Sequence, residues 1–183
     1  KVNFRNVHSE KMEIEALPEG FDAFLMQIQP KDPLLLLYKE VYLLLIMHHN
    51  EGFDRLETLL PKYADKIVPE ELSLILRYLH NYATSQIRKG KNEFWKRIHH
   101  LNKLSLELGI FAKEGLMAGA VFNNIVSAAC YSNDTSWASS FVLSKGSLLQ
   151  EDIREEVVLL AMATIHFKNK DFHQVLDSLV NKN

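Results

Sequence analysis

The spacing of apolar residues constrains this chain more than any other feature of its sequence. Over most of the 183 residues, apolar side chains recur three or four positions apart, which is the period of an α-helix. All five prolines lie within the first 69 residues, so none interrupts this period from Glu70 onward. We find no convincing alternation of apolar and polar residues at period two, as a half-buried strand would show. The sequence therefore predicts an all-α fold.

Residues that favour helix ends mark the boundaries. Asp32-Pro33 offers an N-cap followed by proline at the first helical position, where its missing N–H costs nothing. Gly90, Gly109 and Gly146 fall where helices are expected to end in a left-handed residue. Short turns between helices favour antiparallel hairpins. We expect helices at about 33–49, 52–65, 70–89, 92–108, 114–132, 135–145, 150–168 and 171–181, and a short one within 19–29.

Composition excludes several classes of protein. With 47% hydrophobic and 24% charged residues and a net charge of −2, the chain is neither disordered nor a strongly basic nucleic-acid module. Its one cysteine, Cys130, excludes a disulfide framework and is expected to be a small core residue. The most apolar stretch, 33–47, is interrupted by Lys39 and Glu40 and is shorter than the roughly 20 residues that a membrane crossing needs. We therefore expect a buried helix there and no membrane association.

A similar local pattern returns along the chain. The segment 50–56, with Phe53, matches the segment 169–175, with Phe172. Phe94 and Trp137 also stand just past expected turns, so that aromatic residues follow turns at intervals of about 40 residues. This spacing predicts four helical hairpins that bury their apolar faces by stacking on one another, and the alternative is a non-repeating helical bundle. The repeat domain would span 32–183, after an irregular N-terminal segment 1–31, within a longer protein.

These residues resemble the tetratricopeptide repeat, whose period is about 34 residues. Ala128 ahead of Trp137 follows the pattern in the third hairpin, whereas Leu44 and Ser85 stand where the first two hairpins should have a small residue. The resemblance, to divergent tetratricopeptide-like arrays of bacterial proteins, implies a short α-solenoid with a concave face that holds a peptide or a partner helix. The best match is the last hairpin, through Leu159, Met162, Ala163, Asp171, Phe172 and Val175.

Two adjacent amides, Asn123 and Asn124, lie within an otherwise apolar helix. Asparagine is an indifferent helix former, and a buried amide needs hydrogen-bond partners. As in peptide-binding tetratricopeptide grooves, these amides could hold the backbone of a partner; equally, they could satisfy turn backbone groups or each other. The partner groove that the first interpretation predicts consists of Tyr82, Gln86, Asn123, Asn124, Thr164 and Lys168.

No pattern of reactive residues indicates catalysis. The pairs of adjacent histidines point about 100° apart on a helix, and no acidic residue completes a metal-binding spacing beside them. Phosphate-binding glycine motifs and the nucleophile-elbow motif are absent from the sequence. We expect no metal, no cofactor and no catalytic residue. The eight histidines are His8, His48, His49, His80, His99, His100, His166 and His173.

The segment 88–103 carries a concentration of basic charge. Its lysines and arginines outnumber its one acidic residue, Glu93, and Trp95 lies among them. Such a stretch could meet nucleic-acid phosphates, but the acidity of the whole chain favours a solvated helix face.

The sequence predicts a non-catalytic interaction or scaffold module that binds a protein or peptide partner, with a cytoplasmic location. The alternatives are a regulatory domain that senses a ligand or associates with nucleic acid, and a helical enzyme whose site is assembled from distant residues.

Overall fold

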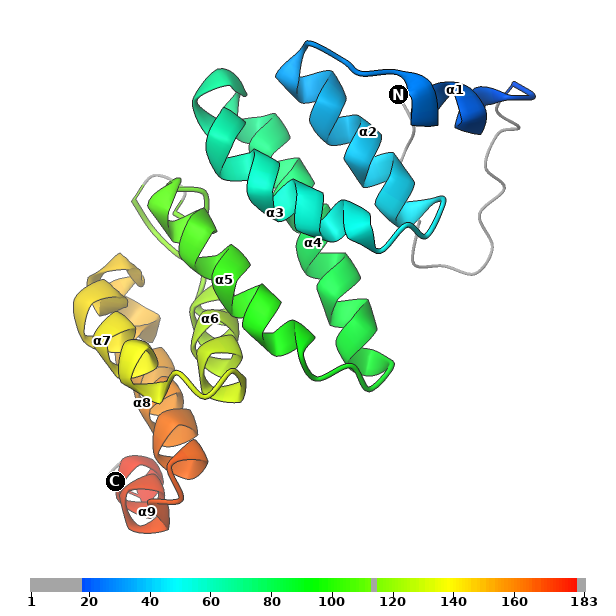
Figure 1. The fold of residues 1–183 in the computed structure, drawn as a ribbon. Helices are drawn as coiled ribbons and strands as arrows, with labels where there is room; N and C mark the ends of the chain where they lie inside the picture. Colours follow the sequence, from blue (N-terminus) through cyan, green and yellow to red (C-terminus); the bar gives the residue numbers. More distant parts are fainter. Residues whose placement is uncertain (1–17, 113–114, 181–183) are drawn as a thin grey trace. The chain divides into compact units, whose positions relative to one another are not determined.

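The computed structural model describes residues 18–112 and 115–180, and this part of the chain is helical, without strands (Figure 1). The all-α prediction is confirmed. Residues 1–17 of the predicted N-terminal segment lie outside the described part. The α-helices are α1 (Phe21–Gln27), α2 (Pro33–Leu45), α3 (Glu51–Tyr63), α4 (Pro69–Arg88), α5 (Phe94–Glu107), α6 (Gly119–Tyr131), α7 (Thr135–Lys145), α8 (Glu151–Lys168) and α9 (Phe172–Val180); η2 (Ala64–Lys66) and η3 (Gly146–Leu148) are 3-10 helices.

The predicted helices agree with these elements, with two larger differences at their ends. The helix expected over 33–49 ends at Leu45, because His48 adopts a left-handed φ of 57° and the N–H of His49 donates to the carbonyl of Leu43 at 2.9 Å. The helix expected over 114–132 begins at Gly119, because the N–H of Met117 donates to the carbonyl of Leu148 at 2.7 Å and holds Met117 outside the helix; residue 114 itself lies outside the described residues.

Asp32 forms the expected N-cap, since its side chain accepts a hydrogen bond from the N–H of Leu35 at 2.9 Å. Gly146 lies at a helix end as expected, as the C-cap of α7, but it does not adopt the left-handed conformation. Gly146 has a φ of −56° and opens η3. Its lack of a side chain is therefore not needed for the turn.

The chain divides into two compact units, residues 1–82 and 83–183, and the division falls inside α4. In the first unit, α1 is fixed to α2: the phenol of Tyr42 donates to Asp22 at 2.9 Å, and Lys39 donates to the carbonyl of Ile28 at 2.7 Å. The buried side chains of this unit include Leu37, Leu43, Phe53, Leu56, Leu60, Ile75 and Leu79.

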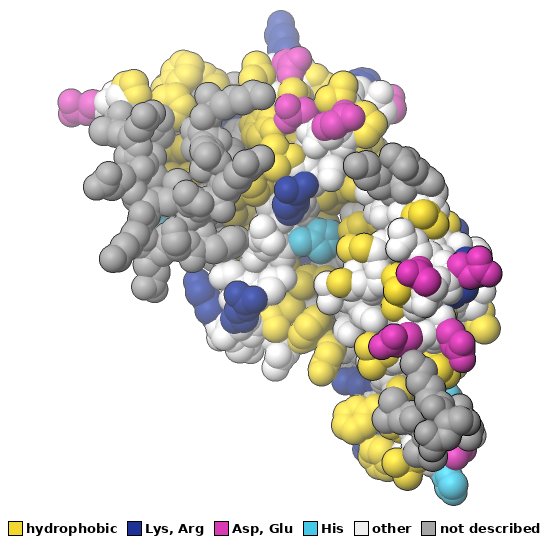
Figure 2. Space-filling model, turned by 180° about the vertical axis from the view of Figure 1, so that it is seen from behind, with side chains coloured by type: hydrophobic (Ala, Val, Ile, Leu, Met, Phe, Trp, Pro, Cys, Tyr) yellow, Lys and Arg dark blue, Asp and Glu magenta, His cyan; other side chains and the backbone are white. Residues whose placement is uncertain are grey.

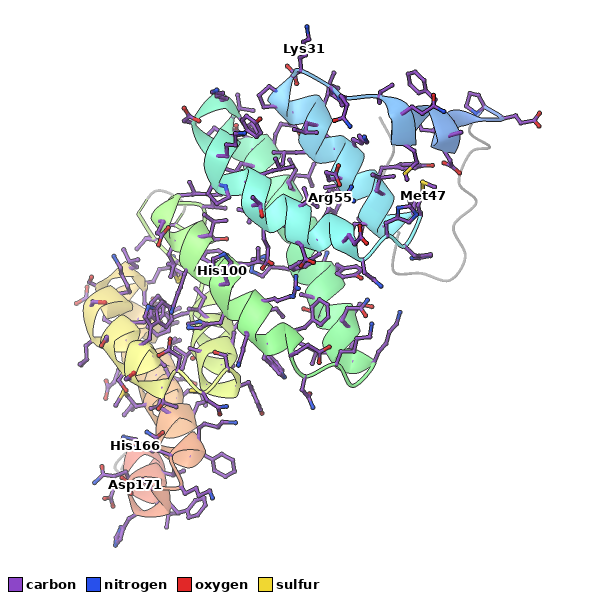
Figure 3. All side chains as sticks on the ribbon, in the orientation of Figure 1. Lys31, Met47, Arg55, His100, His166 and Asp171 are labelled. Atoms are coloured by element: carbon purple, nitrogen blue, oxygen red, sulfur yellow. The ribbon has the colours of Figure 1, made fainter. Side chains whose placement is uncertain are left out.

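Helices α2 and α3 approach each other closely at Gly52. A Cβ atom at Gly52 would lie 3.2 Å from the backbone carbonyl oxygen of Glu40 and 3.2 Å from the Cβ of Leu44. The small residue that the repeat pattern lacks at Leu44 is thus supplied by the facing helix. Arg55 lies between the same two helices and pairs with the buried Glu40 at 3.4 Å (Figure 3).

In the second unit, α6 packs against α5, α7 and α8, and α8 packs against α7 and α9. Gly119 at the start of α6 lies against Val157 of α8, whereas Tyr131 at the end of α6 lies beside Lys168 at the end of α8. The two helices therefore run side by side in the same direction. The core between them includes Phe122, Ile125, Val126, Phe141, Leu149, Ala161 and Ile165, and the buried Cys130, as expected.

Four helices end with the same backbone turn. After α4, α5, α6 and α8, a left-handed residue follows the helix, and the next N–H donates to a carbonyl five residues earlier at 2.9–3.0 Å. The left-handed residues are Gly90, Gly109, Asn133 and Lys170. The first two were predicted; the last two were not, because L-residues with side chains rarely adopt this conformation.

Replacing Lys170 with glycine is expected to stabilise the chain by about 1 kcal/mol, because glycine has no Cβ to strain at a φ of 64°. Urea unfolding followed by circular dichroism measures the change. Asn133→Gly is the matched control, and its gain should be smaller because asparagine tolerates the left-handed region better than lysine. A loss of stability in Lys170→Gly would contradict the strain.

Candidate functional site

The six residues of the predicted partner groove differ in position and exposure. Tyr82 belongs to the first unit and is buried; its ring lies 5.7 Å from that of Phe53, and its hydroxyl bonds to Asn50. Gln86 is also buried, in the second unit. The other four residues lie on α6 and α8, the two helices that run side by side.

The two asparagines of α6 have different surroundings. Asn124 is exposed, whereas the side-chain oxygen of Asn123 is buried and has no hydrogen-bond partner within the described part of the chain. On α8, the hydroxyl of Thr164 donates to the carbonyl of Leu160 at 2.8 Å. The arrangement leaves Asn124 as the amide that solvent reaches.

Three helices contribute to an aromatic stack, which consists of Trp95, Tyr131 and Lys168. The rings of Trp95, at the start of α5, and Tyr131, at the end of α6, are stacked with centroids 4.6 Å apart. The ammonium of Lys168 lies 4.9 Å from the centroid of the Tyr131 ring. Tyr131 is 54% exposed, so the stack is a surface feature.

Only Lys168 of the aromatic stack was among the predicted site residues. Trp95 was noted as an aromatic within the basic stretch, and Tyr131 was not singled out. The sequence indicates only that Trp95 and Tyr131 lie at helix ends. It does not indicate their contact, because the two residues are far apart in the chain. Lys168 forms no ion pair with a carboxylate among the described residues.

A second group, the His99 cluster, ties α5 to the turn between α6 and α7. It consists of His99, Lys103, Asp134 and Trp137. One oxygen of Asp134 lies 3.0 Å from Nε2 of His99 and 3.0 Å from Nζ of Lys103. The ring of Trp137 meets the His99 ring edge-on at 4.7 Å, and Lys103 lies 5.1 Å from the Trp137 centroid.

Two pKa values in the His99 cluster depart from their ordinary values. Hydrogen bonds from His99 and Lys103 lower the pKa of Asp134 to about 2. Burial lowers the pKa of His99 below its ordinary value of 6.5, although the bond to Asp134 acts in the opposite direction. At neutral pH the cluster therefore holds a carboxylate, an ammonium and a neutral imidazole.

The basic stretch 88–103 is divided among the end of α4, the α4–α5 turn and α5. Lys103 points to Asp134, and the guanidinium of Arg97 lies 5.4 Å from the ring of Phe94. On α5, Lys96 and Arg97 lie about 100° and 200° around the helix from Trp95. Lys103, seven residues after Lys96, lies on the same stripe of α5 as Lys96, but its ammonium is engaged by Asp134.

The outer surface of α8 and α9 carries large apolar side chains. Leu160, Phe167, Phe172 and Leu176 are each more than half exposed, and Phe167 meets Phe172 edge-on at 5.8 Å. Figure 2 shows hydrophobic side chains gathered at the lower end of the molecule, beside α9. His166 and Asp171 lie at the nearby α8–α9 turn, 3.9 Å apart (Figure 3).

The residues that the structure describes contain no group of three histidine, cysteine or acidic side chains that could hold a metal ion. Burial raises the pKa of the Cys130 thiol, which disfavours the reactive thiolate. Among the same residues, no helix has the length and apolar character to cross a membrane.

Comparison of the chain with protein-family models, with curated proteins and with solved structures finds no match.

Proposed function

We propose that the chain is a non-catalytic interaction module that binds a segment of a partner protein along α6 and α8. The observation that carries this proposal is a row of solvent-accessible groups on the two helices, in which Tyr131 is 54% exposed although it stacks on Trp95. Asn124 and Tyr131 lie two helical turns apart on one stripe of α6, and Lys168 lies beside Tyr131. These side chains offer an amide, an exposed ring and a cation without a carboxylate partner.

The repeated geometry of the second unit supports a tetratricopeptide-like stack of hairpins. In both α6–α7 and α8–α9, the turn contains a left-handed residue followed by an aspartate: Asn133-Asp134 and Lys170-Asp171. The N–H groups of the two aspartates donate to Ala129 and His166, each at 2.9 Å. Stacked hairpins of this kind present their first helices as a continuous surface to a partner.

The surroundings of the reactive groups favour binding over catalysis. His99 and Asp134 have the composition of a base and the acid that orients it. However, the His99 side chain is only 8% exposed, and the Trp137 ring packs against it. In this arrangement a substrate does not reach the imidazole.

Nucleic-acid association finds less support than protein binding. A nucleic acid requires a row of cations that neutralises successive phosphates. The basic residues of 88–103 are divided among the end of α4, the α4–α5 turn and α5, and Lys103 is already paired with Asp134. The row on α6 and α8 instead mixes amide, aromatic and basic groups, which suits a peptide.

Site-specific photocrosslinking tests the proposal. A photoreactive residue at position 124 is expected to give a discrete crosslinked protein in extracts of the source cells, whereas the same residue at position 143, on the 83%-exposed Leu143 of α7, should not. The double variant Asn124→Ala/Lys168→Gln should bind that protein at least about tenfold more weakly, as expected when a charge-assisted hydrogen bond is lost. Asn124 is exposed and Lys168 is partly exposed, so the melting temperature should change little.

Two results would contradict the interaction module. One is the absence of any crosslinked protein at position 124. The other is the same set of products at positions 124 and 143, which would indicate non-specific contact.

A further inference from the structure

The His99 cluster holds a buried imidazole with one ring nitrogen paired and the other unpaired. Nε2 of His99 lies 3.0 Å from a carboxylate oxygen of Asp134, which can only accept a hydrogen bond. The neutral ring therefore carries its proton on Nε2. Nδ1 is buried and has no hydrogen-bond partner among the described residues.

Protonation of His99 would place a positive charge in the buried cluster. A charged ring would lose its hydration in this buried place and would carry an Nδ1–H without an acceptor, and this cost outweighs the stronger bond that the imidazolium would make to Asp134. The ring would also gain a positive charge next to Lys103, whose ammonium binds the same oxygen of Asp134 at 3.0 Å. The charged or titratable groups that act on His99 within the described chain are Asp134 from the α6–α7 turn, and Lys103 and His100 from α5 itself.

The same helix pair carries the aromatic stack. His99 and Trp95 are four residues apart on α5, so they lie on one face of the helix. That face meets α6 and the start of α7 at two places, through Trp95 with Tyr131 and through His99 with Asp134 and Trp137. Loss of the second contact therefore weakens the position of Trp95 over Tyr131.

We propose that the His99 cluster is an acid-sensitive latch, in which protonation of His99 releases α5 from the α6–α7 turn and separates Trp95 from Tyr131. The release itself is independent of any partner. Its consequence for binding rests on the function proposed above, because Tyr131 belongs to the row on α6 and α8. Acidification then weakens partner binding by removing one wall of the aromatic stack.

The direction follows from the buried state of the imidazole. Burial disfavours the charged ring, so the latch is closed when His99 is neutral and opens as the pH falls below 6.5. Asp134 keeps its charge over this range because its pKa is about 2. Within the cluster, the change is thus confined to His99.

Hydrogen–deuterium exchange of the full chain at about pH 7.5 and about pH 5, corrected for the intrinsic pH dependence of exchange, tests the latch. In the wild type, amides of α5 and of the first turn of α7 should exchange at least about tenfold faster at the lower pH, since an opening that costs 1.4 kcal/mol less is tenfold more populated. The rate in α9 should not change. In His99→Gln, whose amide can donate to Asp134 but cannot be charged, the response should disappear.

A matched control and a second measurement keep the result interpretable. His100→Gln, at the exposed neighbouring histidine, should retain the wild-type response. If His99→Gln does not fold, an NMR titration of the wild type decides: the His99 ring and the Trp95 indole signals should change together below pH 6.5. A Trp95 signal that does not follow His99, or a response that persists in His99→Gln, overturns the latch.

The crosslinking experiment at both pH values separates this inference from the proposed function. Crosslinking that is strong at about pH 7.5 and lost at about pH 5, together with the exchange response, supports regulation of the binding surface. Equal crosslinking at both pH values, with the exchange response present, overturns the regulation but leaves the interaction module. Absence of crosslinking at both overturns the interaction module but leaves the latch.

Discussion

Asp134→Ala is expected to lower the free energy of unfolding by about 3 kcal/mol, because one carboxylate accepts hydrogen bonds from several groups at once. It caps α7 through the N–H of Trp137 at 3.4 Å, and it accepts from His99 and from Lys103 at 3.0 Å each. Loss of an N-cap costs about 1 kcal/mol, and a buried imidazole left without a partner costs about 1–3 kcal/mol more. Denaturant unfolding at neutral pH measures the sum.

Asp171→Ala is the matched control for this prediction. Asp171 occupies the same place in the α8–α9 turn and accepts from the N–H of Gln174 at 3.4 Å, but its other contact is His166 at 3.9 Å on an exposed surface. We expect a loss of about 0.5–1 kcal/mol, as for an exposed cap. Equal losses in the two variants would show that the His99 cluster adds nothing to stability.

The contribution of Asp134 has a defined pH range. Its pKa is about 2 in the folded chain and 3.8 in its ordinary state, so the unfolded chain binds the proton first as the pH falls. The stabilisation is therefore complete above about pH 4 and is lost as the pH falls through about 2. The difference between wild type and Asp134→Ala should narrow over this range in thermal melts.

Gly52→Val is expected to destabilise the chain by about 3 kcal/mol, because the approach of α2 and α3 leaves no space for a side chain. The new Cβ would lie 3.2 Å from the carbonyl oxygen of Glu40, and a backbone atom in the middle of a helix cannot move away alone. The helices would have to separate and loosen the packing around Leu44. Thermal and urea unfolding of the variant give the size of the loss.

Gly146→Ala is the control for Gly52. This glycine is also buried and has a negative φ, but a Cβ there would meet only Val158, at an ordinary 3.5 Å. We expect a change within about 0.5 kcal/mol. If both variants are equally stable, the contact between α2 and α3 is not as tight as the distances indicate.

Local chemistry predicted the helices and many of their ends. The apolar period located all the described α-helices, and Asp32, Gly90 and Gly109 act at helix ends as expected. The errors arose where a distant segment decides the outcome. Helix α6 begins late because Met117 bonds to Leu148, and no pattern near residue 117 contains that information.

The candidate site was less predictable than the fold. Helical spacing places Tyr82 and Gln86 on a face, but it does not say whether that face is covered, and both side chains are buried. The contacts of Trp95 with Tyr131 and of His99 with Asp134 join residues 35 or more positions apart. Such pairs depend on how hairpins pack, which composition and local spacing do not encode.

The common turn after α4, α5, α6 and α8 has a consequence for how sequences of this kind can diverge. The turn is built from main-chain hydrogen bonds and one residue of unusual conformation, and glycine, asparagine and lysine all serve there. The left-handed position favours glycine, but asparagine and even lysine can occupy it at a cost of about 1 kcal/mol or less, while the main-chain hydrogen bonds of the turn stay the same. Relatives of this chain could share its backbone fold and have amino-acid sequences with almost no recognisable similarity.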